Sequence, residues 1–157
     1  MNKITTPKGI AGNLFLARPD TKFGTKGFYK VGITLNAAEV GQMVEACNEE
    51  ATRAFGPKNV AKVKMPFEVN AHGTVTFKFG SRSRPNLYDS TATLLEPGVI
   101  DALRIGYGST IRVKGETATY ERFGGGVLLL MHEVQIIDLV ESGGFAPDVG
   151  GSFVAEG

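Results

Sequence analysis

Three stretches of the chain alternate apolar with polar residues, the period-two pattern of strands that bury one face. They span residues 28–35, 74–82 and 110–123. Their apolar sets are Tyr29, Val31, Ile33 and Leu35, then Val75, Phe77 and Phe79, then Ile111 and Val113. A fourth stretch, 127–140, is mostly apolar, which is typical of a strand inside a closed sheet. Glycines at 124–126 predict a hairpin turn between the last two strands, because glycine tolerates positive φ.

A helical pattern separates the first two alternating strands. Asn36 can cap this helix, and Glu39, three residues later, can complete a capping box. Gly56 and Pro57 then end the pattern. Between these signals, apolar residues recur at helical spacing at Val40, Met43, Val44, Cys47, Ala51 and Phe55. A shorter helix is predicted over residues 98–105.

These elements predict a mainly β protein in which 21 glycines among 157 residues interrupt short strands. Alternating strands and one helix after the second or third strand are typical of a small barrel, and the pattern alone does not separate barrel types. The five-stranded OB-fold, with one main α-helix and a short second helix, is the leading candidate. We expect this domain to span residues 1–141. The glycine-rich, aperiodic segment 142–157 is predicted to be a flexible tail.

The net charge of +1 hides an uneven distribution of charge along the chain. Residues 1–36 hold six basic residues and one acid, and residues 53–88 hold seven and one. The segment 133–157 has five acids and neither lysine nor arginine. This asymmetry indicates a basic surface for a polyanion and an acidic end that competes with it. The alternative is the ordinary mixture of charges on a solvated surface.

The polar faces of the three alternating strands combine cations with aromatic rings. Binding of single-stranded DNA without sequence preference requires both, because cations follow the phosphates and rings stack on bases. Strict alternation places Phe123 opposite Tyr120, and a bulge or the glycine turn would bring both rings to one side. For each residue the alternative is an ordinary solvent-exposed or core side chain. The predicted DNA contacts are Lys26, Phe28, Lys30, Lys78, Arg82, Arg84, Tyr88, Arg112, Lys114, Tyr120, Arg122 and Phe123.

A series of short segments, taken in order, carries further information. The segments are Arg18-Pro19-Asp20, Lys26–Val31 (KGFYKV), Cys47–Ala51 (CNEEA), Met65-Pro66-Phe67, Gly73–Phe79 (GTVTFKF), Gly106–Ser109 (GYGS), Glu133–Val140 (EVQIIDLV) and Gly143-Gly144-Phe145. Together they resemble the single-stranded DNA-binding proteins of short-tailed phages and their relatives in other tailed phages. The resemblance covers about residues 12–145, and it depends on the order and spacing of the segments rather than on any one of them.

The resemblance implies an OB-fold protein that coats and protects single-stranded DNA in phage DNA replication and recombination, and that promotes annealing. Its implied partners are the phage DNA polymerase and primase-helicase, and a homodimer is one implied state. Its implied location is the cytoplasm of the infected bacterial host. Lys26 matches a basic DNA-binding residue of the family, Tyr120 and Phe123 match two aromatic contacts, and Lys3 matches a lysine contact near the N-terminus.

The C-terminal segment departs from the pattern of that family. The family tail is a dense acidic run closed by an aromatic residue. After Ser142 this chain has only Asp148 and Glu156 as acids, with Phe153 close to the end. The resemblance therefore does not extend to partner binding or dimer exchange through such a tail.

Other functional classes find little support in the sequence. His72 and His132 are far apart, and no spacing of cysteine and histidine indicates a metal site, so we expect neither metal nor cofactor. Cys47 fits the apolar helical face better than a catalytic role, and no run of about 18 apolar residues predicts a membrane span. We expect no enzymatic activity. The alternatives are a β-rich phage structural or oligomerisation protein without a nucleic-acid role, and a small nucleotide-processing enzyme.

Overall fold

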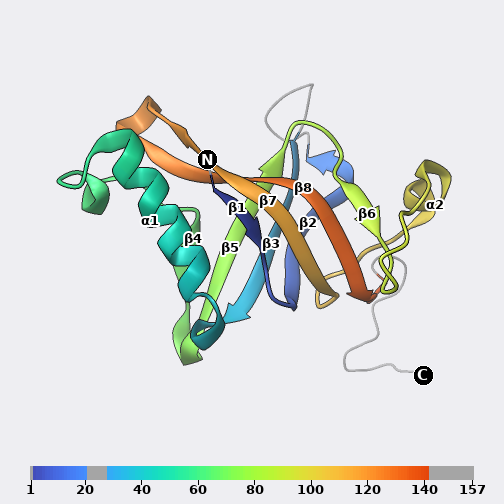
Figure 1. Cartoon of the computed structure of the whole chain (residues 1–157). Helices are drawn as coiled ribbons and strands as arrows, with labels where there is room; N and C mark the ends of the chain where they lie inside the picture. The colour runs from blue at the N-terminus through green and yellow to red at the C-terminus, as the bar shows by residue number, and fades with distance from the viewer. Residues whose placement is uncertain (1, 21–27, 142–157) are drawn as a thin grey trace.

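Five strands close into a barrel in the computed structural model, which describes residues 2–20 and 28–141 (Figure 1). The order around the barrel is β7–β2–β3–β5–β8, and β8 pairs with β7 to complete the ring. Neighbouring barrel strands are antiparallel except β5 and β8, which are parallel. The barrel strands are β2 (Gly9–Asp20), β3 (Phe28–Asn36), β5 (Thr74–Ser81), β7 (Thr110–Tyr120) and β8 (Gly126–Asp138). The prediction of a five-stranded OB-fold is confirmed.

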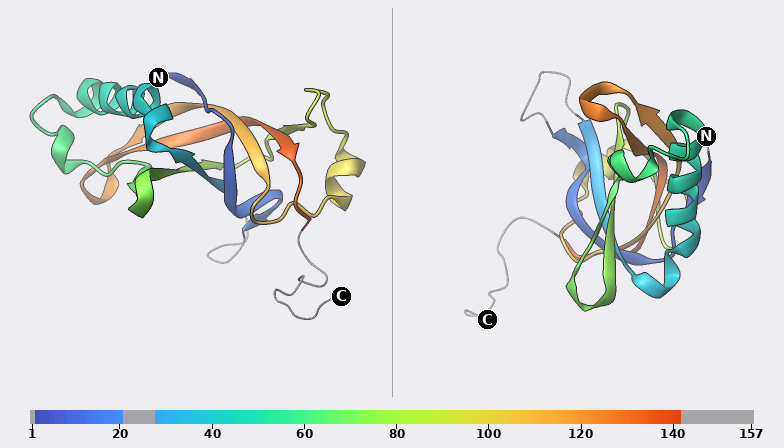
Figure 2. Two further views of the ribbon diagram at one scale, coloured as in Figure 1. Left: turned by 90° about the horizontal axis from the view of Figure 1, so that it is seen from below. Right: turned by 90° about the vertical axis from the view of Figure 1, so that its left-hand side faces the viewer.

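Short elements extend this barrel. Strand β1 (Lys3–Thr5) pairs with β7, β4 (Phe67–Val69) pairs with β5, and β6 (Asn86–Tyr88) pairs with β8. Helix α1 (Gly41–Phe55) covers one end of the barrel and α2 (Pro97–Ala102) lies toward the other end (Figures 1 and 2). The 3-10 turns are η1 (Ala37–Glu39), η2 (Val60–Lys62), η3 (Ala71–Gly73) and η4 (Arg122–Gly124). No helix of the described part of the chain is long and apolar enough to cross a membrane.

The interior of the barrel contains most of the apolar residues that the alternating sequence pattern predicts to be buried. Phe77, Ile33 and Val113 have no exposed surface, and Phe79 and Leu35 are each 2% exposed. Tyr29 is the exception among the predicted set, because it lies near the start of β3 and is only half-buried. The alternation therefore identifies the inner and the outer face of β3, β5 and β7.

The main helix begins later than the sequence predicts. Asn36 accepts a hydrogen bond from the amide of Ala38 at 2.9 Å, which caps η1 and not an α-helix. The predicted capping box with Glu39 is therefore wrong. Val40 leaves helical geometry and is 3% exposed, since it turns into the core before α1 starts at Gly41.

Helix α1 packs on the barrel through an apolar face that includes one carboxylate. Cys47 has no exposed surface and is a core side chain, and its burial, with Glu50 nearby, raises the pKa of its thiol to about 12. Glu50 is 6% exposed, accepts a hydrogen bond from the Thr117 hydroxyl at 2.9 Å and pairs with Arg53 at 3.2 Å. These partners satisfy the buried charge and fix α1 on strand β7.

Gly115 permits the close contact between β7 and β8. The register between these strands shifts between Lys114 and Gly115, which marks a bulge. A Cβ at position 115 would collide with the backbone carbonyl of Leu130, and backbone cannot move aside as a side chain can. The bulge therefore requires glycine at this position.

We expect Gly115→Ala to lower the free energy of unfolding by about 2 kcal/mol or more, because overpacking of a buried site forces the backbone to shift. The matched control is Gly41→Ala in the first turn of α1, where a Cβ would meet nothing within 4 Å. The control should change stability by less than about 1 kcal/mol, in the favourable direction. Urea unfolding followed by circular dichroism measures both, and equal stability of the two variants would contradict this account of the bulge.

Candidate nucleic-acid interface

The structure distributes the predicted site residues over three outer surfaces of the barrel. Phe28, Lys30, Lys78 and Arg82 belong to β3 and β5 or directly follow them, Tyr120, Arg122 and Phe123 belong to the β7–β8 turn, and Tyr88, Arg112 and Lys114 belong to β6 and β7. Lys3 lies on β1, beside β7. Lys26 lies outside the described residues, so its role stays a prediction. We call these surfaces the barrel face, the turn group and the niche.

The barrel face is the outer surface of β2, β3 and β5. Lys30 of β3 lies opposite Phe15 of β2 on one side and Gly80 of β5 on the other. Its ammonium lies 5.4 Å from the centre of the Phe15 ring, a cation–π distance. Lys78 lies opposite Gly32 in the next outward row. Cations and an aromatic ring thus share one surface.

Two aromatic rings of this face, Phe15 and Tyr107, were missed by the sequence analysis. Tyr107 is 79% exposed, and its ring lies 3.2 Å from the position that a Cβ on Gly12 would take. No strand was predicted over β2, and the register of β2 is irregular between Gly12 and Phe15, so the sequence did not identify this ring. The available signal was the glycine in β2, since a strand glycine often marks the close approach of another group.

Lys78 is engaged in an ion pair at the edge of the barrel face. Its ammonium lies 2.7 Å from Glu68 Oε1, and both side chains are more than half exposed. The hydrogen bond from Lys78 and its positive charge hold the pKa of Glu68 below its ordinary value of 4.5. Exposed pairs of this kind are weak and readily exchanged, so a phosphate can replace Glu68 as the partner.

Arg84 has a structural contact that the sequence did not reveal. Its guanidinium lies 2.9 Å from Asp101 Oδ1 and 3.5 Å from the carbonyl oxygen of Ala17. Arg18 donates to the carbonyl oxygen of Asp101 at 3.1 Å, so two arginines join α2 to β2 and to the segment after β5. Contact of Arg84 with DNA stays a prediction. In the structure, this residue links the segment after β5 to α2 and β2.

The turn group lies at the end of the barrel that helix α1 covers, where a Cβ on Gly125 would meet the Phe55 ring (Figures 1 and 2). Tyr120 is half-buried because it packs over Gly126 on the neighbouring strand. Phe123 is 97% exposed and has a φ of 57°, a left-handed conformation that is uncommon for a bulky residue. Such strain at an exposed aromatic indicates a functional position. The turn also holds the positive φ of Gly124 and Gly125 that the sequence predicted.

The niche is a hollow on the outer face of β6, β7 and β8. Arg112 and Lys114 of β7 lie opposite Gln135 and Glu133 of β8, respectively. Tyr88 of β6 lies on the other side of Gln135. The structure therefore brings together three predicted residues from segments far apart in the sequence.

Fold and surface together define a class of protein. An OB-fold barrel binds oligonucleotides and oligosaccharides on the outer face of its second and third strands and on the adjoining loops, and here these are β3, β5 and the β7–β8 turn. Rings beside cations on that face define a polyanion-binding OB-fold protein.

Solved structures share this fold over most of the chain. The chain is similar to gp2.5, a single-stranded DNA binding protein encoded by bacteriophage T7, with a TM-score of 0.73 and 26% identity over 97% of this chain and 99% of that one. It is also similar to the single-stranded DNA-binding protein from bacteriophage Enc34, C-terminally truncated (TM-score 0.70, 12% identity, 89% and 87% covered) or in complex with ssDNA (0.68, 13%, 91% and 90%). The predicted resemblance to phage single-stranded DNA-binding proteins is confirmed. No family model and no curated protein sequence matches the chain.

We expect the Glu68 carboxylate to titrate below its ordinary range, and Lys78→Met to bring it back. Because the pKa is lowered in the folded state, the ion pair is complete above the ordinary pKa and is lost as the pH falls through the lowered one. NMR titration of side-chain carboxyl signals measures this shift. Asp89, whose pKa is lowered by hydrogen bonds from Thr91 and Thr93, is the internal reference whose titration Lys78→Met should leave unchanged. An identical Glu68 titration in both proteins would contradict the pair.

Proposed function

We propose that this chain binds single-stranded DNA without sequence preference and coats and protects it in phage DNA replication and recombination. The observation that carries the proposal is the OB-fold barrel face, where Phe15, Lys30 and Tyr107 lie on the outer surface of β2 and β3. The similarity to bacteriophage gp2.5 and to the Enc34 protein in complex with ssDNA supports the same ligand.

Two interactions account for the proposed binding: bases stack on aromatic rings, and cations contact the phosphates. Stacking of a base on an aromatic ring contributes about 1–3 kcal/mol and tolerates any base, because every base has a π-face. Phe28, 50% exposed, and Phe123, 97% exposed, are available for this contact. Lys30, Arg82 and Arg122 supply the phosphate contacts, which release counterions and make the affinity fall with salt. Since neither term reads base edges, the binding is sequence-independent.

The remaining parts of the function follow from the family resemblance. We infer that the chain promotes annealing, contacts the phage DNA polymerase and primase-helicase, forms a homodimer as one state, and works in the cytoplasm of the infected host. We also infer that it binds DNA without turnover, as a protein whose structural neighbours are DNA-binding proteins. The division into a binding domain, 1–141, and a flexible tail, 142–157, is part of the same proposal.

A salt titration tests the proposed function directly. The chain has no tryptophan, so quenching of tyrosine emission reports binding of oligo-dT. We expect binding to oligo-dT that weakens as salt is raised, and much weaker binding to duplex DNA of the same length. Equal affinity for duplex, or no binding at all, would refute the proposal and favour a structural role for this phage protein.

We expect Phe123→Ala to weaken oligo-dT binding by about 1–3 kcal/mol with little change in salt slope, because a stacking partner is lost and no charge changes. The matched control is Val69→Ala on β4, an apolar residue that is 77% exposed outside the three surfaces. The control should bind like the parent protein. Parent-like affinity of Phe123→Ala across the salt titration would remove the turn group from the interface.

A further inference from the structure

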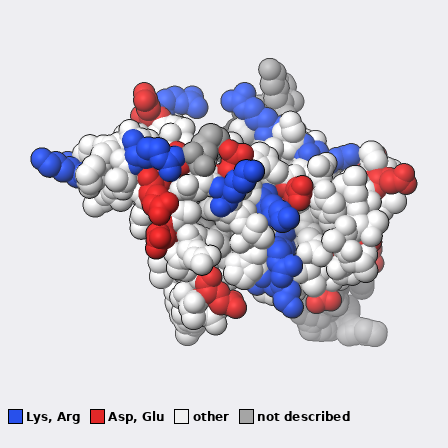
Figure 3. Space-filling model, viewed as in Figure 1, with Lys and Arg blue, Asp and Glu red and all other residues white. Residues whose placement is uncertain are grey.

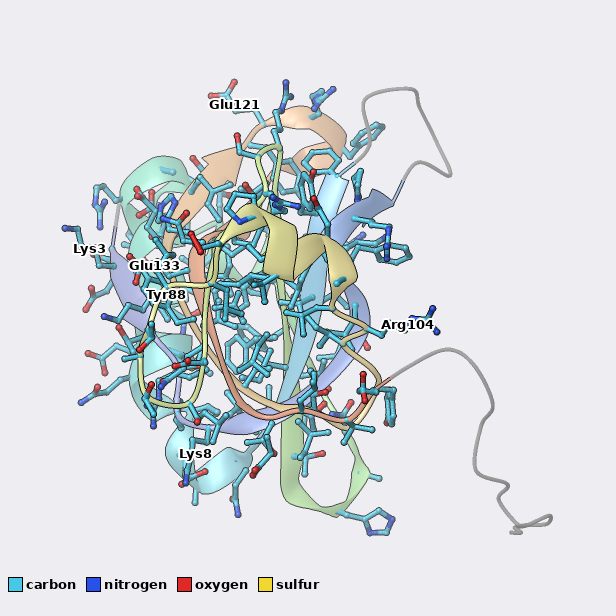
Figure 4. All side chains as sticks on the ribbon, turned by 90° about the vertical axis from the view of Figure 1, so that its right-hand side faces the viewer. Lys3, Lys8, Tyr88, Arg104, Glu121 and Glu133 are labelled. Carbon is cyan, nitrogen blue, oxygen red and sulfur yellow. The ribbon has the colours of Figure 1, made fainter. Side chains whose placement is uncertain are left out.

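The niche consists of two rows of side chains across three neighbouring strands. The register places Lys114, Glu133 and Asn86 in one row, and Arg112, Gln135 and Tyr88 in the next. The intervening residues Val113, Val134 and Leu87 have no exposed surface. The two rows therefore face outward together, and Figure 4 shows Tyr88 and Glu133 close to each other, well away from Glu121 of the β7–β8 turn.

Hydrogen bonds fix one wall of the niche. Gln135 Nε2 donates to the carbonyl oxygens of Asp89 and Ser90 at 3.3 and 3.1 Å, and its Oε1 accepts from Arg112 at 3.3 Å. Asp89 accepts from the Thr91 hydroxyl at 2.7 Å and from the Thr93 amide at 3.0 Å. These bonds lower the pKa of Asp89, the hydroxyl of Thr91 contributing most. The loop beyond Tyr88 is thereby held in one shape, with Ala92 at a φ of 64°.

The size and lining of the niche limit what it can hold. Its volume is about 170 Å³, below the 300–1,000 Å³ range of pockets for drug-sized ligands, so it suits one planar ring. Tyr88 offers an aromatic surface for stacking, and Ala92 leaves room beside it. Arg112 and Lys114 add positive charge at the rim, where the phosphate of the nucleotide that carries this ring would lie.

Glu133 supplies the acceptor that distinguishes one base from another. Within the described residues, the carboxylate of Glu133 makes no side-chain ion pair or hydrogen bond, although Lys114 is its cross-strand neighbour. Gln135 is already engaged on both of its amide atoms, so Glu133 is the free acceptor of the niche. A carboxylate accepts from the exocyclic amine of cytosine, whereas thymine presents an acceptor at the equivalent position.

The basic surface continues from the niche along β7 and β1. Arg112 lines the niche and also a second hollow of about 360 Å³, whose rim includes Lys3. Figure 3 shows lysine and arginine side chains gathered in a column down the middle of this face. A strand with one base in the niche would thus have a path of positive charge for its neighbouring phosphates.

We propose that the niche is a nucleobase subsite, separate from the barrel face, that takes one base bearing an exocyclic amine and favours cytosine over thymine. Tyr88 stacks on the base, Glu133 accepts from its amine, and Arg112 and Lys114 contact the flanking phosphates. The inference rests on the proposed binding of single-stranded DNA. It adds a base preference at one position to a surface that is otherwise indifferent to sequence.

Competition between oligo-dC and oligo-dT of equal length for a labelled strand tests the subsite in the full chain. We expect the parent protein to prefer oligo-dC by about 3- to 10-fold, in line with the net contribution of one typical hydrogen bond. Glu133→Gln should bring the two affinities within about two-fold, because an amide can also donate to thymine. Glu45→Gln on α1 removes the same charge away from the niche and should keep the parent ratio.

A second variant protects the test against a folding defect. Tyr88→Leu should weaken binding of oligo-dC more than that of oligo-dT, while circular dichroism of the variant stays that of the parent. A ratio near one in the parent protein, or a parent-like ratio in Glu133→Gln, would overturn the subsite while leaving single-strand binding intact. Failure of the parent protein to bind either oligonucleotide would instead refute the proposed function on which the subsite rests.

Discussion

The parallel pairing between β5 and β8 is the contact on which the rest of the structure depends, because it converts a bent sheet into a closed barrel. Two residue pairs define it, Phe79 with Leu129 and Gly80 with Leu130. Once the ring is closed, each strand has one inner and one outer face, and the inner positions must fill the interior. The outer positions escape that packing requirement, which is why rings and cations can occupy them without disturbing the core.

Closure of the barrel also places several glycines on its outer side, on the barrel face. Gly12 lies opposite Gly32, and Gly80 lies opposite Lys30. Glycine within a strand weakens it, so its presence on an outer face indicates that something approaches the backbone closely. The Tyr107 ring already uses the space over Gly12. Of the other two, Gly32 is buried, whereas Gly80 is half-buried beside Lys30 and leaves a flat stretch of backbone against which a base can lie.

The sequence predicted the faces of the strands well and the contacts between distant elements poorly. Alternation identified the inner residues because each barrel strand has one buried side. No strand was predicted over residues 9–20, so Phe15 on β2 was missed. The capping signals placed the start of the main helix too early, because Val40 turns into the core before Gly41. The partners of Arg84 and Lys78 come from separate elements, Asp101 and Glu68, and no local pattern encodes them.

The niche also shows that local sequence patterns do not reveal contacts between distant elements. Tyr88, Arg112 and Lys114 were selected one by one for their chemistry, and only the strand register shows that they meet. Glu133 belongs to one of the segments that carry the family resemblance, and the sequence alone assigned it no role. Its role in the niche follows from the absence of a side-chain partner among the described residues, which only the structure shows. Spacing along a chain cannot reveal such a group when three strands contribute to it.

Ion pairs decide how many of the surface cations can act on a phosphate backbone. Lys78 and Arg84 are already paired with carboxylates, whereas Arg112 is held by the neutral amide of Gln135 and keeps its full charge. A paired cation must release its carboxylate before it neutralises a phosphate, so it contributes less to counterion release than an unpaired one. The number of basic residues on the surface therefore overstates the salt dependence of binding. The exposed rings add a contribution to affinity that does not require the release of these ion pairs.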